Sequence, residues 1–170
     1  MARRLARRPL LAGLLLGLTG CGFRPLLKRV GDAGVQQELA AIELKGLDGR
    51  LGQLIRNALL DELNPTGAPV PARYVLDMRA NRRVRALAIQ LNSTITRFNL
   101  TVTVRFSLRQ RGQTDVLYAS TVQRVASYDV SRQPFADLVA EQTAEQRAAK
   151  EIGTQIRTLL AFHFARRGSA

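Results

Sequence analysis

The sequence has few of the residues from which enzymes build catalytic sites. Its 170 residues include one cysteine, one histidine and no tryptophan, and aromatic residues make up only 5% of the chain. A single cysteine forms neither an intrachain disulfide nor a cysteine-based zinc site. His163 has no second histidine or free thiol with which to build a Ser-His or Cys-His nucleophile. The sequence therefore predicts no enzyme and no metal or other cofactor.

Other common signatures are missing as well. The carboxylates are dispersed, and the adjacent pair Asp61-Glu62 is typical of a helix surface, so no glycosidase-type acid and base pair is indicated. Gly46, Gly49 and Gly52 match neither the dinucleotide fingerprint nor the phosphate-loop spacing, and we interpret them as turn and helix-start residues. The longest apolar run is shorter than the about 20 residues that a membrane-spanning helix needs.

What the sequence does have is an N-terminal segment with the parts of an export signal. Four arginines precede an apolar run, Leu10–Leu18, and small residues follow before Cys21. The stretch LTGC at 18–21 resembles the bacterial lipobox. The resemblance implies that residues 1–20 are a lipoprotein signal peptide, cleaved between Gly20 and Cys21. It also implies that Cys21 carries a thioether-linked diacylglycerol and an N-acyl chain such as palmitate.

Such a lipid anchor is durable, because each buried methylene contributes about 0.8 kcal/mol and several chains act together. The residue after Cys21 is Gly22 and not aspartate, so the familiar signal for retention in the inner membrane is missing. We therefore expect an outer-membrane lipoprotein. The alternative is that Cys21 is an ordinary buried thiol. The order of arginines, apolar run and lipobox argues against it.

The chain also has a large excess of positive charge. Without residues 1–20 it has 22 basic and 13 acidic side chains, a formal charge of +9. This balance is typical of nucleic-acid-binding proteins, and a cytoplasmic RNA-binding protein without a signal peptide is one alternative. An exported lipoprotein instead meets phospholipid headgroups, peptidoglycan carboxylates and lipopolysaccharide phosphates, and no nucleic acid.

The first part of the mature chain predicts a tether, a strand and a helix. Residues 21–37, with a proline and several glycines, are the expected acylated tether. A strand is expected within 38–49, and a helix follows that ends at Asn64-Pro65, because the residue before a proline avoids the α region. The apolar positions expected to face the core are Ala40, Ile42, Leu44, Leu51, Leu54, Ile55, Ala58 and Leu59.

The rest of the chain predicts three strands and a long helix. Apolar and polar residues alternate within 73–87 and 95–112. A turn then leads to a further strand, 116–130, so that the last two strands form a hairpin. From Pro134 onward the spacing is helical, with core positions at Leu138, Ala148, Ile152, Ile156, Leu159 and Leu160.

This order, strand–helix–strand–strand–strand–helix, predicts an α+β fold in one domain over 38–167. Each helix has one apolar stripe and three of the strands have one apolar face. We expect a two-layer α/β sandwich, in which two helices pack on one face of a four-stranded mixed sheet. The opposite face would be open and basic. Its arginines would be Arg79, Arg83, Arg97, Arg105 and Arg109.

A basic sheet face is compatible with a polar wall or an anionic ligand. Antiparallel sheets also commonly leave one polar face to solvent without any partner, and the alternation alone favours that simpler interpretation.

Four stretches, in matching order, resemble the lipopolysaccharide-assembly lipoprotein family, LptE. They cover nearly the whole mature chain: Gly20–Leu26, Ile42–Asn64, Ser93–Leu108 and Val125–Ile156. The resemblance implies a plug inside the lumen of the outer-membrane β-barrel LptD, lipid-anchored and facing the periplasm. It implies help in barrel assembly, binding of lipopolysaccharide, and its insertion into the outer leaflet of a Gram-negative envelope.

The ligand residues are our own inference from strand alternation and are not carried over from the family: Arg79, Arg83, Arg97 and Arg105. Two further functions remain as alternatives. One is an auxiliary lipoprotein of an ABC-type lipid or solute transport system. The other is an exported cell-wall enzyme, against which the missing catalytic residues argue.

Overall fold

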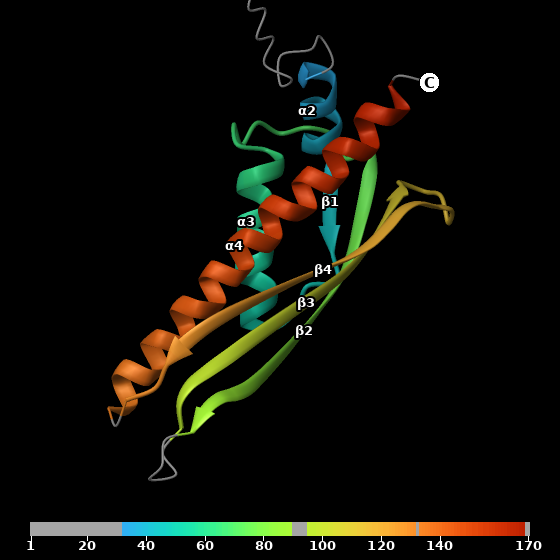
Figure 1. Ribbon diagram of the computed structural model, residues 1–170. Helices are drawn as coiled ribbons and strands as arrows, with labels where there is room; N and C mark the ends of the chain where they lie inside the picture. The colour runs from blue at the N-terminus through green and yellow to red at the C-terminus, as the bar shows by residue number, and fades with distance from the viewer. Residues whose placement is uncertain (1–31, 90–94, 132, 169–170) are drawn as a thin grey trace, which may run out of the picture. The chain divides into compact units, whose positions relative to one another are not determined.

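The computed structural model describes residues 32–89, 95–131 and 133–168 (Figure 1). The expected signal peptide, its cleavage site at Gly20 and Cys21, and the start of the expected tether lie outside the described residues. The elements, in chain order, are α2 (Asp32–Ala40), β1 (Ile42–Lys45), α3 (Gly49–Leu63), β2 (Tyr74–Ile89), β3 (Ile95–Gln110), β4 (Val116–Asp129) and α4 (Pro134–Arg167).

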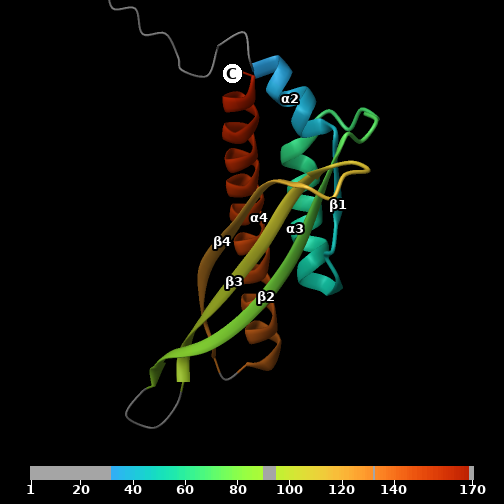
Figure 2. The same ribbon diagram turned by 90° about the vertical axis from the view of Figure 1, so that its right-hand side faces the viewer.

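The four strands form one mixed sheet in the order β1-β2-β3-β4. β1 pairs with β2 in parallel, whereas β2–β3 and β3–β4 are antiparallel. Figure 2 shows α3 and α4 behind the sheet, so that both helices cover the same face and the other face is open. The predicted α+β architecture and order of elements are confirmed.

The start of the domain differs from the expected tether and strand. Residues 32–40 form helix α2, and the strand is limited to Ile42–Lys45. The sequence of α2 is rich in residues that favour helices, and Val35 and Leu39 pack one turn apart against the core. Ala40 therefore ends a helix and does not share a strand face with Ile42.

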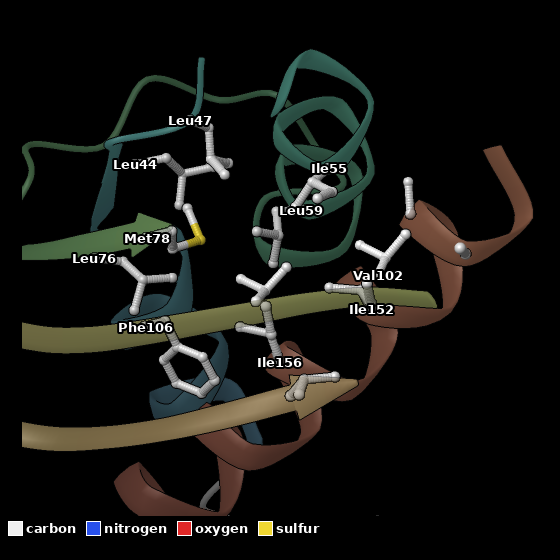
Figure 3. Close-up of a cluster of buried hydrophobic side chains, with 14 of the residues drawn as sticks. Leu44, Leu47, Ile55, Leu59, Leu76, Met78, Val102, Phe106, Ile152 and Ile156 are labelled. Atoms are coloured by element: carbon white, nitrogen blue, oxygen red, sulfur yellow. The ribbon is translucent and has the colours of Figure 1, made fainter. Parts of the chain in front are cut away.

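The core lies between the sheet and the two helices. The alternation predicted for β3 is confirmed, because Leu100, Val102, Val104, Phe106 and Leu108 are all buried. Figure 3 shows side chains of β1, β2 and β3 meeting those of both helices. The helix residues in this contact are Ile55 and Leu59 of α3 and Ile152 and Ile156 of α4.

Helices α3 and α4 approach each other closely at Gly153. A β-carbon at this position would lie 3.2 Å from the Ala58 side chain, so the contact depends on two small residues.

Near the start of α4 the prediction for Leu138 is wrong, because 51% of this residue is exposed. With 34 residues, α4 is more than twice as long as α3, and its first buried residue is Ala144. Leu138 lies six residues before Ala144, in a part of α4 of which only Ala140 packs against the core.

Candidate functional site

The open face of the sheet brings three arginines of the two central strands together. The register places Arg79 of β2 directly opposite Arg105 of β3, and Arg83 opposite Thr101. Like charges at directly opposite positions of neighbouring strands destabilise a sheet. The pair therefore lowers the stability of the folded state unless an anion lies between the two guanidinium groups.

These residues line a shallow hollow of about 490 Å³. No carboxylate contributes to its lining, and neutral hydrogen-bonding side chains fill the space between the arginines. Within the described residues, Arg79, Arg83 and Arg105 have no hydrogen bond or ion pair. The lining consists of Arg79, Ala80, Asn81, Arg83, Thr101, Thr103, Arg105 and Gln123.

Arg97, the fourth predicted ligand residue, lies outside this hollow. Its Nε and Nη2 donate to the two carboxylate oxygens of Asp129, at 2.7 and 3.1 Å. The hydrogen bonds to Arg97 lower the pKa of the Asp129 carboxyl group. Arg109 likewise donates to Asp77 at 3.2 Å. The structure thus brings three of the four predicted residues together and places the fourth in an ion pair; binding by any of them stays a prediction.

Sequence alternation could not distinguish these two groups of arginines. All of them occupy the same face of the sheet, but their neighbours depend on the register between strands. Gln123 of β4 was not a candidate either, and it reaches the hollow because its position lies opposite Thr103. Only the pairing of β3 with β4 shows that Gln123 lies beside the arginines.

Another arginine of β2 faces the helices instead. Arg82 Nε lies 2.9 Å from Glu145 of α4, and a second nitrogen of its guanidinium pairs with Glu141. Arg50, at the start of α3, also pairs with Glu145, at 3.3 Å. This cluster links β2, α3 and α4 on the covered side of the sheet. We interpret it as structural.

The chemistry that the hollow can perform is the binding of an anion. Guanidinium groups donate paired hydrogen bonds to phosphate or carboxylate oxygens, and hydroxyl and amide groups add neutral donors.

Among the described residues, no group of acidic, histidine or cysteine side chains has the arrangement of a metal site. In the same part of the chain, no helix has the length and apolar character needed to cross a membrane.

Residues 37–160 match the LptE family, whose description is lipopolysaccharide-assembly. The chain belongs to the LptE family. A crystal structure described as a lipoprotein from Caulobacter crescentus CB15 is 30% identical in sequence, with a TM-score of 0.67; the match covers 79% of this chain and 97% of that one. No protein with a curated description matches the sequence.

A second structure, described as a minor lipoprotein from Acinetobacter baumannii, is 20% identical with a TM-score of 0.52. The match covers 74% of this chain and 90% of that chain, and it shows a shared fold. Membership of the LptE family makes lipopolysaccharide assembly the process, and the cell envelope the place, in which this chain acts. The description of the family names an assembly function.

Proposed function

We propose that this LptE-family protein is an outer-membrane lipoprotein that sits in the lumen of an LptD-type β-barrel and supports its assembly. In this role it assists the passage of lipopolysaccharide to the outer leaflet. Acyl chains on Cys21 would anchor it, after removal of residues 1–20. The lumen of a large outer-membrane barrel is polar, and the open sheet face suits such surroundings because its side chains are polar and basic.

The observation that carries the ligand part of this proposal is the hollow with three arginines that have no partner in the described part of the chain. Phosphates of lipopolysaccharide match guanidinium forks in charge and geometry. A bound phosphate between Arg79 and Arg105 would also turn their mutual repulsion into a shared attraction.

The ligand proposal is tested with the double variant Arg79→Gln/Arg105→Gln. We expect its affinity for lipopolysaccharide to fall about tenfold or more, because at least one charge-assisted hydrogen bond is lost. Its thermal stability should be unchanged or slightly higher, since the repulsion between the two strands is removed. Binding is measured on immobilised lipopolysaccharide and stability by circular dichroism.

The matched control is Arg97→Gln/Arg109→Gln, which removes the same charge from the same face but outside the hollow. Its affinity should change much less. Unaltered binding by the folded Arg79→Gln/Arg105→Gln variant, or equal losses in both double variants, would contradict a site in the hollow.

The partner is tested by purifying the tagged full chain from detergent-solubilised outer membranes. One large β-barrel protein in near-stoichiometric amount supports the proposed complex, whereas inner-membrane transport components would favour the ABC-type alternative. Mass spectrometry of the mature N-terminus tests the anchor independently. A protein that retains Met1 and carries no lipid on Cys21 would contradict it.

A further inference from the structure

Strand β2 has a long outer edge. β1 pairs only with Tyr74–Asp77, but β2 continues to Ile89. Figures 1 and 2 show β1 ending while β2 runs on well beyond it. Over the stretch from Ala80 to Ala86, no strand among the described residues pairs with this side of β2. An unpaired edge of this length is a template for an additional strand.

Contacts near β1 show which backbone groups point to this edge. The N–H groups of Arg73 and Tyr74 both donate to the carbonyl of Ala41, on the β1 side. Within the strand, the carbonyl oxygen of Met78 faces the same side, because a β-carbon on Gly46 would lie 2.5 Å from it. The N–H of Arg111 donates to the carbonyl of Arg73, on the β3 side. Backbone groups of successive strand residues point in opposite directions, so even-numbered residues of β2 face the outer edge. The residues that present N–H and C=O groups there are Ala80, Arg82, Val84 and Ala86.

Uncompensated positive charge along this edge lies on one face of the sheet. Arg79, Arg83 and Arg85 are exposed on the open face, and none has an ion pair with a described residue. On the helix face the charge of Arg82 is balanced by Glu141 and Glu145. An added strand would therefore meet positive charge through every second side chain and a near-neutral surface through the others.

This pattern excludes two occupants. Antiparallel pairing of two β2 edges would bring the arginines of both copies to the same face, where like charges oppose pairing. The chain's own residues 22–31 contain Arg24, Lys28 and Arg29 and no acidic residue, so they do not complement the edge either.

We infer that the β2 edge from Ala80 to Ala86 binds an extended acidic segment of a partner protein as a fifth strand. Its carboxylates would alternate with uncharged residues and lie beside Arg79, Arg83 and Arg85. In such strand addition, main-chain hydrogen bonds supply affinity and alternate side chains supply specificity. The inference goes beyond lipopolysaccharide binding, because it depends on backbone groups that the hollow does not use.

The probe for this experiment is a synthetic nine-residue peptide of alternating glutamate and threonine, blocked at both ends. It is added to the full-length mature protein in detergent micelles, and amide hydrogen exchange is followed residue by residue. We expect the amides of Ala80, Arg82 and Val84 to exchange at least about tenfold more slowly with peptide bound. Odd-numbered amides of β2 should change little, because they already bond to β3.

The matched control peptide has glutamine in place of glutamate and should bind much more weakly. A matched pair of variants tests the edge itself. Ala80→Pro removes an outward N–H that the β3 ladder does not use, so the fold should persist and peptide binding should be lost. Ala80→Ser keeps the N–H and should bind as the native chain does.

Three results would overturn the inference. The first is the absence of peptide binding. The second is binding that protects none of the even-numbered amides, which would show a purely electrostatic association with the arginines. The third is equal binding of the glutamine peptide. The exchange measurement on the native chain decides between these outcomes even if Ala80→Pro fails to fold.

Discussion

At the scale of single residues, Glu145 is the most buried acidic residue in the described part of the chain. The residue is only 7% exposed and bridges Arg82 and Arg50. Glu145→Gln leaves both guanidinium groups with a weaker partner in a partly buried place. We expect the free energy of unfolding to fall by about 2 kcal/mol, less than for a fully buried pair because both arginines reach solvent. Urea denaturation measures this.

The control is Glu151→Gln on the same helix. The Glu151 side chain is 59% exposed and lies 3.6 Å from Arg124. Exposed pairs of this kind contribute about 0–1 kcal/mol, so the control should change stability much less. Equal effects of the two substitutions would mean that the Glu145 cluster does not hold the helix layer to the sheet.

His163, the single histidine, links the fold to pH. Its ring stacks on Tyr118 and lies beside Phe164, and burial together with Arg167 and Arg166 lowers its pKa. The folded state therefore binds a proton on His163 less readily than the unfolded chain does. The resulting contribution to stability is complete above the unfolded pKa of about 6.5 and is lost as the pH falls through the lower folded value.

We expect the native chain to lose stability between pH 7.5 and pH 5.5, and His163→Phe to lose less over the same interval. Denaturation at the two pH values measures the difference. Carboxyl groups titrate in both proteins and cancel in the comparison. Parallel pH profiles for the native chain and His163→Phe would show that His163 carries no such coupling.

At the scale of elements, the β1–α3 connection depends on Gly46. Gly46 has a φ of +76°, and a β-carbon there would lie 2.5 Å from the carbonyl oxygen of Met78. Gly46→Ala therefore combines left-handed backbone strain with a clash against β2, and we expect a loss of about 3 kcal/mol. Gly67 has a φ of +63° with open space around it. Gly67→Ala should cost about 1 kcal/mol.

Thermal and urea denaturation of both variants provides the measurement. The difference between them isolates the contact with Met78 from the backbone strain that the two glycines share. Similar losses would mean that β1 and β2 can separate locally without cost.

At the scale of the whole molecule, charge is sorted between the two layers. On the helix side, Arg82, Arg124 and Arg157 each pair with a glutamate. In the middle of the open face, Arg79, Arg83 and Arg105 have no partner among the described residues. These three arginines of the central strands are thus displayed together on the open face. This sorting links the proposed anion site and the proposed strand-binding edge, which share Arg79 and Arg83.

The sequence by itself determined the order of the elements, the faces of the strands and the family. Alternation identified the buried side of β3 correctly, since a period of two is unambiguous over sixteen residues. The tertiary structure alone decided which arginines have no partner among the described residues. Arg97 and Arg105 occupy equivalent positions in the alternating pattern of the sequence. The β3–β4 register places Asp129 opposite Arg97 and Thr121 opposite Arg105.

The same holds for Leu138 and for the edge of β2. Helical spacing predicted that Leu138 faces the core, but the buried stripe of α4 begins only at Ala144 and leaves Leu138 exposed. Likewise, only the early end of β1 leaves the backbone of Ala80–Ala86 unpaired. Local patterns specify which side of an element faces the core; how far each element extends past its partners is a property of the assembled sheet and helices.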